Sequence, residues 1–201
     1  MRLRNIPNAS EILLESEYLI KEFPYKLNNK TVLEMGMGKG EMLVELAKQN
    51  PDTTFIGIEK YPTVALKSMK KAKKLNLKNF KIINQDIAKL PELLEGKVDL
   101  IWLTFSDPWP KKRHFKRRLT YKDFLLIYKN LLTDNGILKF KTDNDSLFEY
   151  SIESIEEFGA KILNLTRDFH NSDLSKNNIM TGYEKKWSEK GKNINYLEIK
   201  F

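Results

Sequence analysis

The sequence predicts an α/β fold in which a doubly wound, mostly parallel sheet carries helices on both faces. Two observations predict it. Short runs rich in β-branched and aromatic residues alternate with amphipathic helical patterns along most of the 201 residues, and a glycine-rich turn joins the first strong pair. Such alternation requires crossover connections between parallel strands. Without an internal repeat or linker, we expect an N-terminal segment, residues 1–29, and a single domain, residues 30–201.

The composition favours a soluble protein with a polyanionic partner. There are 35 Lys and Arg against 27 Asp and Glu, which gives a formal net charge of +8. No run approaches the roughly 18 apolar residues that span a bilayer, and Met1 to Ser10 lacks a secretory apolar core, so we expect a cytoplasmic protein. The chain has no cysteine, which excludes disulfides and thiolate nucleophiles, and with two histidines we expect no metal site.

The first half of the chain predicts three strands and two main helices. They follow a short amphipathic helix over Glu11–Phe23, which Pro24 ends. The strands are apolar and β-branched, and the helices repeat apolar residues three and four positions apart. The strands are expected at Thr31–Met35, Thr54–Ile58 and Phe80–Asn84, and the helices from Met42 to Ala47 and at Thr63–Leu75.

A glycine cluster follows the first strand. Gly36, Gly38 and Gly40 have the spacing G-x-G-x-G, one residue shorter than the dinucleotide pattern, and glycine allows a close approach of backbone to ligand. Glu34 precedes the cluster, and Glu59 ends the second strand at the spacing where a carboxylate can bind the hydroxyls of a ribose. A surface carboxylate is the alternative for Glu59. Ribose binding is the better account because the rest of that strand is apolar.

The fourth strand, Val98–Phe105, leads into the most distinctive stretch of the sequence. Asp107 is followed by Pro108-Trp109-Pro110, in which two prolines restrict the turn. Seven of the eight residues from Lys111 to Arg118 are Lys, Arg or His. A fixed carboxylate beside an aromatic ring and a basic run suits a nucleobase and its phosphates. A packed loop with a solvated face is the alternative, but ligands bind beyond the carboxyl ends of strands in open α/β sheets.

The second half continues the alternation of helices and strands. A helix from Thr120 is expected to end at Asn135-Gly136, and a polar loop is expected over His170–Met180. Asp145 is the expected N-cap of the next helix. The remaining elements are expected as a strand at Ile137–Lys141, a helix at Ser146–Phe158, and strands at Lys161–Thr166 and Tyr196–Phe201.

Several carboxylates are expected at one edge of the sheet, because each follows a strand. These residues are Glu34, Glu59, Asp86, Asp107 and Asp143. Asp86 stands where a carboxylate can meet the amino group of an adenine. Acidic groups suited to ribose and adenine, without the dinucleotide glycine spacing, indicate S-adenosylmethionine, whose cationic sulfonium is tolerated beside carboxylates.

The sequence resembles the bacterial tRNA (guanine-N7-)-methyltransferase family from about Thr31 to the terminus. The blocks that carry the resemblance are LEMGMGKGEML, NPDTTFIGIEKY, FSDPWPKKRHFKRRL, LKFKTDNDSLFEYS and TGYEKKW. The resemblance implies a Rossmann-like, seven-stranded methyltransferase sheet with an antiparallel C-terminal strand. It implies methyl transfer from S-adenosylmethionine to N7 of a tRNA guanine, at position 46 in the variable loop.

The resemblance also implies roles for the candidate site residues, with Asp107 as the catalytic residue. The donor is expected at Glu34, at the glycine turn of Gly36, Gly38 and Gly40, and at Glu59, Asp86 and Asp107. The guanine is expected at Lys111, Asp143, Thr181, Gly182, Tyr183 and Glu184. The tRNA is expected at Arg113, His114, Phe115, Lys116, Arg117 and Arg118. The residues favour neither a monomer nor a homodimer.

The chemistry of guanine N7 agrees with this set of residues. N7 has a lone pair and no proton, so no general base is required and positioning dominates, while Asp107 stabilises the positive charge that develops on the ring. An adenine amino-group methyltransferase is the rival enzyme. Such enzymes carry an Asp/Asn-Pro-Pro-aromatic turn, whereas in this sequence the second proline comes after the tryptophan. A noncatalytic RNA-binding protein is disfavoured by the complete set of carboxylates, and a nicotinamide dehydrogenase by the glycine spacing.

Overall fold

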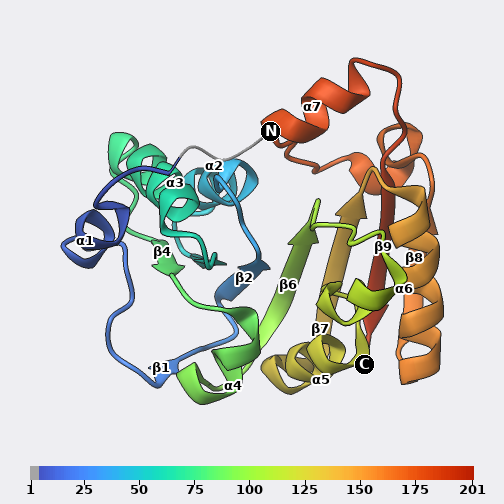
Figure 1. Cartoon of the computed structure of the whole chain (residues 1–201), viewed down its shortest axis with the longest axis horizontal. Coiled ribbons are helices and arrows are strands. Elements are labelled where there is room, and N and C mark those ends of the chain that lie inside the picture. The colour runs from blue at the N-terminus through green and yellow to red at the C-terminus, as the bar shows by residue number, and fades with distance from the viewer. Residues whose placement is uncertain (1–4) are drawn as a thin grey trace.

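A seven-stranded sheet forms the centre of the computed structural model, which describes residues 5–201 (Figure 1). In chain order the strands are β2 (Thr31–Met35), β3 (Thr54–Ile58), β4 (Phe80–Ile83), β6 (Val98–Thr104), β7 (Leu132–Thr142), β8 (Lys161–Thr166) and β9 (Asn195–Lys200). Their order across the sheet is β4-β3-β2-β6-β7-β9-β8. The pairs from β4 to β7 are parallel, and β9 is antiparallel to both of its neighbours. The predicted doubly wound sheet with an antiparallel C-terminal strand is confirmed.

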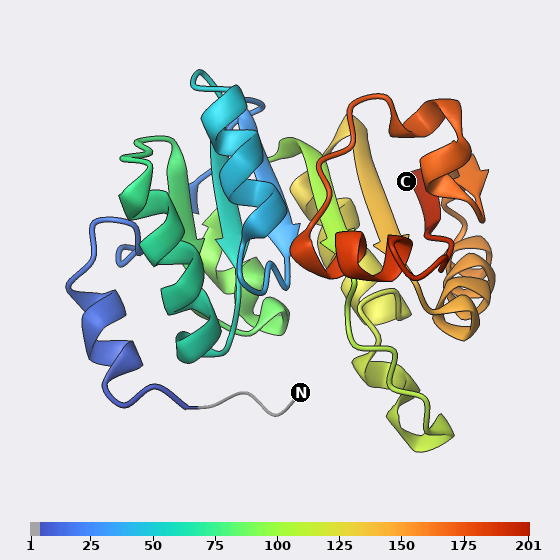
Figure 2. The same ribbon diagram turned by 90° about the horizontal axis from the view of Figure 1, so that it is seen from above.

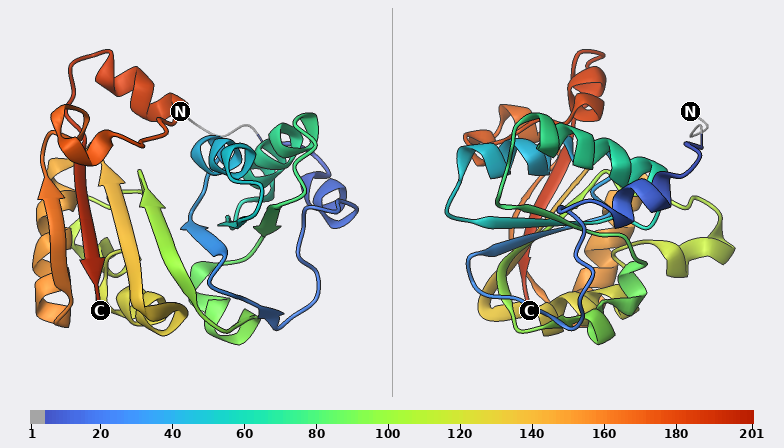
Figure 3. Two further views of the ribbon diagram at one scale, coloured as in Figure 1. Left: turned by 180° about the vertical axis from the view of Figure 1, so that it is seen from behind. Right: turned by 90° about the vertical axis from the view of Figure 1, so that its left-hand side faces the viewer.

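Helices cover both faces of this sheet (Figure 3). One face carries α1 (Ala9–Leu14), α2 (Glu41–Gln49), α3 (Pro62–Lys74) and α7 (Gly182–Ser188), and the other carries α4 (Leu90–Leu93), α5 (Lys122–Leu131) and α6 (Asp145–Phe158). Successive side chains of a strand point to opposite faces of the sheet. Val32 therefore packs in the hydrophobic core under α1, α2 and α3, and Leu33 packs in the core under α4, α5 and α6. No helix within residues 5–201 is long and apolar enough to cross a membrane.

Short elements complete the fold. A two-stranded parallel sheet joins β1 (Tyr25–Lys26) to β5 (Leu94–Glu95). The 3₁₀ helices within residues 5–201 are η1 (Ile87–Lys89), η2 (Lys112–Arg117), η3 (Phe169–Asn171) and η4 (Asp173–Ser175). Helix η3 overlaps the start of the segment expected to be a polar loop and η4 lies within it. Helix α7 follows them where only the Thr181 to Glu184 motif was expected.

The predicted helix over Glu11–Phe23 is wrong. Helix α1 ends at Leu14, and the chain then runs beside the edge strand β4, where Ile20 N donates to Ile82 O at 2.9 Å and Ile82 N donates to Tyr18 O at 2.8 Å. Tyr18 and Ile20 are buried there. Pairing with an exposed strand edge therefore outweighs the local helical pattern.

Two boundaries on the second half also differ from expectation. Helix α5 ends at Leu131 rather than at Asn135-Gly136, because Leu132 already pairs with Val98 as the first residue of an eleven-residue β7. The N-cap of α6 is Asn144, whose Oδ1 accepts from Leu147 N at 2.8 Å. Asp145 instead bonds to Lys192 and Asn195, which lie close only in the folded chain.

A buried ion pair attaches the segment between β8 and β9 to the sheet. Lys141 of β7 and Glu184 of α7 are both fully buried, and Lys141 Nζ lies 2.9 Å from Glu184 Oε2. Asn178 Oδ1 accepts from the same Nζ at 2.9 Å, and His170 Nε2 lies 2.9 Å from Glu184 Oε1. Burial lowers the pKa of Lys141, and Glu184 opposes this shift. Burial alone would raise the pKa of Glu184, but Lys141 and His170 outweigh it and the pKa is lowered.

Replacing Lys141 with methionine tests the importance of this pair. We expect Lys141→Met to lower the free energy of unfolding by roughly 3–5 kcal/mol, because Glu184 would keep its buried charge without the ammonium partner. Urea denaturation measures the loss. The double variant Lys141→Met, Glu184→Gln should recover part of it, since no buried charge then remains at the pair. An equal loss in the two variants would contradict the assigned role of the pair.

Candidate active site

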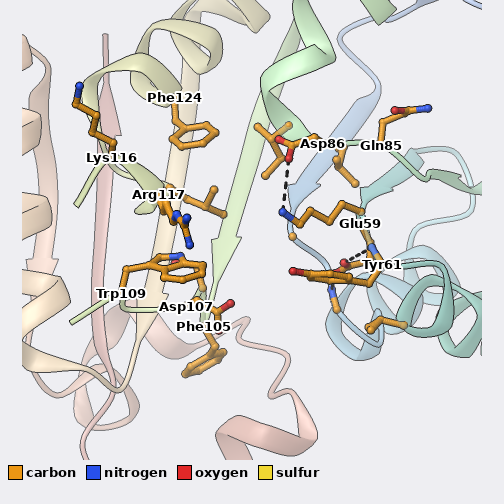
Figure 4. Close-up of a pocket in the computed structure, with 18 residues that line it drawn as sticks. Glu59, Tyr61, Gln85, Asp86, Phe105, Asp107, Trp109, Lys116, Arg117 and Phe124 are labelled. Atoms are coloured by element: carbon orange, nitrogen blue, oxygen red, sulfur yellow. Dashed lines mark hydrogen bonds and ion pairs between the residues drawn. The ribbon is translucent and has the colours of Figure 1, made fainter. Parts of the chain in front are cut away.

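A cavity of about 720 Å³ opens at the carboxyl ends of β2, β3, β4 and β6 (Figure 4). Its walls come from the glycine turn, the turns after β3 and β4, and the segment after β6. Glu59 and Tyr61 lie on one side, and Trp109 and Arg117 lie on the other. Its volume is within the range of about 300–1,000 Å³ that small-molecule sites occupy.

The glycine turn forms the floor of this cavity. Gly36 N and Met37 N both donate to Ile58 O, at 2.9 and 3.0 Å, which holds the turn against the end of β3. Gly36 and Gly38 have φ of 74° and 57°, and a Cβ on Gly38 would meet no atom within 4 Å. Gly40 does not line the cavity. A Cβ there would lie 2.6 Å from Ser68 Cβ, so Gly40 allows α2 and α3 to pack closely.

The carboxylates at the ends of β3 and β4 both line the cavity. Glu59 is nearly buried and accepts from Gly38 N at 3.2 Å and from Tyr61 N at 2.9 Å. Burial raises the pKa of Glu59 in spite of these backbone donors, and the negative charge of Asp107 adds to the rise. Asp86 caps η1 through Ala88 N at 3.0 Å and lies 3.6 Å from Lys60 Nζ, an ion pair that Figure 4 marks with a dashed line.

Glu34 is absent from the cavity lining, although the sequence predicts it at the donor. It lies on the central strand β2 between β3 and β6, is fully buried and accepts a hydrogen bond from the Thr104 hydroxyl. Its Oε2 has no hydrogen-bond partner in the described structure. Burial raises the pKa of Glu34 to about 7, although Thr104 and the charge of Lys141 act in the opposite direction.

The backbone on both sides of Asp107 is strained. Within residues 5–201, the non-glycine residues with positive φ are Asn8, Asn76, Phe105 and Trp109. Asparagine tolerates this conformation, but a bulky aromatic residue does so at a cost of about 1–3 kcal/mol. Phe105, at φ 50°, and Trp109, at φ 43°, stand two positions before and two after Asp107. The strain therefore coincides with the exposed carboxylate that lines the cavity.

Two arginines of the basic run hold this turn in place. Arg118 donates from Nε to Pro108 O and from Nη2 to Trp109 O, both at 3.2 Å, and its guanidinium lies 4.2 Å from the centre of the Tyr150 ring. The Arg117 guanidinium lies 4.9 Å from the centre of the Trp109 ring. Part of the predicted tRNA surface thus has an intramolecular structural role.

The rest of the basic run projects from the body of the protein as η2 (Figure 2). None of its residues is buried, and Lys111, Arg113 and Lys116 are exposed. Two aromatic contacts attach η2 to neighbouring residues. The ring of His114 packs edge-on against that of Trp109, with the ring centres 5.7 Å apart, and the ring of Phe115 packs edge-on against that of Tyr121, with the centres 5.3 Å apart. The segment begins five residues after Asp107, and two of its cations, Lys116 and Arg117, line the cavity.

Most of the residues predicted at the guanine gather just after β7 and at the start of α7, whereas Lys111 lies apart from them, at the start of η2. Tyr183 donates its hydroxyl to Asp143 Oδ2 at 3.1 Å, and its ring centre lies 5.3 Å from that of Phe105. Thr181 and Glu184 form the capping box of α7, and Gly182 N donates to Glu41 Oε2 at 2.5 Å. These contacts leave Tyr183 exposed and Glu184 buried.

Sequence reasoning missed two residues that organise this region, Glu41 and Phe105. Phe105 looked like an ordinary final residue of an apolar strand, and its positive φ is visible only in the structure. Glu41 is an acidic residue in the first turn of α2, where the helix dipole alone accounts for it. Its contact with Gly182 joins residues 141 positions apart, so no local pattern reveals it.

The raised pKa of Glu34 predicts a dependence of stability on pH. The folded-state pKa of about 7 exceeds the ordinary 4.5, so the unfolded chain loses this proton first as the pH rises. The free energy of unfolding should therefore fall between pH 4.5 and 7, by roughly 3 kcal/mol from this group. Glu34→Gln removes the contribution. In urea denaturation the wild type should lose stability relative to Glu34→Gln across this window, and a constant difference would contradict the assignment.

Comparisons with known proteins agree with this geometry. A family model described as "Putative methyltransferase" matches residues 28–197. The tRNA (guanine-N(7)-)-methyltransferase of Mycoplasmopsis pulmonis is 55% identical over 201 residues, 100% of this chain and 99% of that protein. The protein of the same name from Mesomycoplasma hyopneumoniae strain 7448 is 53% identical and covers 100% of both chains.

Solved structures share the fold at low sequence identity. The crystal structure of an S-adenosylmethionine-dependent methyltransferase from Aquifex aeolicus has a TM-score of 0.60 and 17% identity, and the match covers 96% of this chain and 88% of that one. Such a likeness shows the fold alone. The family model and the full-length relatives together show that this chain belongs to the tRNA (guanine-N(7)-)-methyltransferase family.

Proposed function

We propose that this chain transfers the methyl group of S-adenosylmethionine to N7 of a guanine in the variable loop of tRNA. The observation that carries this proposal is the position of Asp107, an exposed carboxylate on a strained turn between a cavity and a projecting cationic segment. Relatives named tRNA (guanine-N(7)-)-methyltransferase match this chain from end to end and support it.

The residues of the cavity fit this methyl donor. Gly36 and Gly38 leave room for a ligand against the backbone, and Glu59 and Asp86 offer carboxylates for ribose hydroxyls and an adenine amino group. Glu59 already accepts two backbone N–H groups, but a carboxylate has about four lone-pair sites and can accept further donors. When bound, S-adenosylmethionine supplies an electrophilic methyl group on a positively charged sulfur.

Asp107 acts on charge rather than on a proton. The N7 lone pair forms the new bond to the methyl carbon as the bond from that carbon to sulfur breaks, so no proton moves. Positive charge passes from the sulfur to the guanine ring. The Asp107 carboxylate, fixed by the turn that Arg118 holds, stabilises the charge that develops on the ring. Most of the remaining rate enhancement comes from holding N7 in line with the methyl group.

The exposed cations of η2 position the tRNA. Arg113 and Lys116 are exposed on a segment that projects beside the cavity, so they are free to contact phosphates on either side of the target nucleotide. Such contacts fix the register of the RNA and read no sequence. Selection of the guanine then depends on the surfaces next to Asp107.

Asp107→Asn tests the charge role of the carboxylate. We expect single-turnover methyl transfer to slow by about 10²- to 10³-fold, the typical effect of removing one group that stabilises transition-state charge. Binding of tRNA and of S-adenosylmethionine should remain largely intact, since the amide keeps the shape of the side chain. Asp52→Asn, at an exposed carboxylate away from the cavity, is the matched control. An unchanged single-turnover rate in Asp107→Asn would refute the role.

Neutralising two cations of η2 tests the tRNA surface. We expect Arg113→Gln, Lys116→Gln to reduce the slope of log affinity for tRNA against log salt concentration by about 1.4–1.8, because each lost phosphate contact removes about 0.7–0.9. Lys73→Gln, Lys74→Gln at the exposed end of α3 makes the same change in net charge and should leave the slope unchanged. Equal slopes for the two double variants would show that η2 does not bind phosphates.

A further inference from the structure

We propose that Phe105 is the stacking residue for the target guanine, and that its ring forms with Tyr183 an aromatic wall beside Asp107. This inference rests on the proposed function and deepens it. It assigns to the base a contact surface that neither the acidic groups nor the basic run can provide, since a purine buries two apolar faces as well as polar edges.

The backbone of Phe105 is the first observation. Its φ of 50° lies in the left-handed region, which aromatic residues rarely adopt, whereas Asn8 and Asn76 are of the type that tolerates it. The sheet enforces this conformation, because Phe105 N donates to Lys141 O at 2.9 Å, one residue beyond the end of β6. Strained conformations of this kind persist where the surrounding structure holds them, and they cluster at functional sites.

The surroundings of the ring are the second observation. Phe105 lines the cavity beside Asp107, at the end away from Gln85 and Asp86 (Figure 4). The Tyr183 ring lies 5.3 Å away at an interplanar angle of 58°, and it is 46% exposed. The Tyr183 hydroxyl is tied to Asp143 at 3.1 Å. The two rings therefore form a preorganised surface of which one edge faces the cavity and the other faces solvent.

The other aromatic rings of the cavity have different neighbours. The Arg117 guanidinium lies 4.9 Å from the centre of the Trp109 ring, and Lys60 Nζ lies 5.3 Å from the centre of the Tyr61 ring, which adjoins Glu59 at the donor end. Phe105 instead has the buried Lys141 beside it, with Nζ 5.9 Å from the centre of its ring. Among the aromatic residues lining the cavity, Phe105 is the one whose ring contacts α7, through Tyr183. It thus bridges the donor cavity and the segment predicted at the guanine.

Three substitutions at Phe105 separate the ring from the backbone. Phe105→Asn removes the ring but tolerates the left-handed backbone, so relief of strain should offset part of the thermal stability that is lost when the ring no longer packs against Phe169 and Tyr196. Phe105→Leu keeps an apolar side chain without an aromatic face, and Phe105→Tyr keeps the aromatic face. Loss of stacking should reduce kcat/KM for tRNA by about 10- to 100-fold in the Asn and Leu variants, whereas the Tyr variant should retain most activity.

A direct readout uses tRNA with 2-aminopurine at the target position, whose emission is quenched by stacking. Quenching on binding should occur with the wild type and Phe105→Tyr and should be lost with Phe105→Asn and Phe105→Leu. Calorimetric affinity for S-adenosylmethionine should not change in any variant. Wild-type quenching and kcat/KM in the Asn and Leu variants would overturn the proposal. Parallel losses of donor affinity and thermal stability would overturn it in favour of a structural role.

The same measurements distinguish a failure of the stacking proposal from a failure of the proposed function. If the wild type methylates tRNA at guanine N7 and Phe105→Asn does so equally well, stacking on Phe105 is excluded and the proposed function stands. If the wild type transfers no methyl group to guanine N7, the proposed function fails, and with it the substrate on which the stacking proposal depends.

Discussion

The parallel direction of β2, β3, β4, β6 and β7 is the constraint on which the rest of this structure depends. Because these strands share one direction, the turns that leave their carboxyl ends emerge at one edge, and that edge is where the cavity lies. Strand β8 ends at the same edge before β9 returns antiparallel, so the segment between them, with α7, is brought there too. Residues more than a hundred positions apart, such as Glu41 and Gly182, thereby come into contact.

Lys141 links the two halves of this edge. Its carbonyl accepts from Phe105 N and thus sets the start of the Asp107 turn, while its ammonium pairs with Glu184 and thus fixes α7. A buried charge pair tolerates little displacement, because each charge has lost its hydration and is stabilised mainly by the other. Lys141 therefore contributes to the position of Tyr183 relative to Phe105, together with the hydrogen bond from Tyr183 to Asp143. This arrangement offers a physical reason for a lysine in the interior of a sheet.

The basic run shows how one stretch of sequence divides between contacts that stabilise a turn and exposed charge. Arg118 and Arg117 turn back onto Pro108, Trp109 and Tyr150, where they stabilise a turn whose backbone is strained. Arg113 and Lys116 of the projecting η2 are exposed, and Arg117 stays exposed as well while it lies over the Trp109 ring. In the sequence all four are equivalent cations, since composition carries no information about which carbonyl or ring lies within reach. The division arises from the geometry of the turn.

Local pattern determined the strands and turns of this protein. Thr31–Met35, Thr54–Ile58 and Lys161–Thr166 form as predicted because burial selects apolar and β-branched runs, and the carboxylates Glu59, Asp86 and Asp107 lie in the cavity because they follow strand ends. Only the tertiary structure decided that Glu34 is buried against Thr104, 70 positions away, and that residues 18 to 20 pair with β4 instead of extending a helix. Burial and edge pairing are set by neighbours distant in the chain, which periodicity and spacing do not encode.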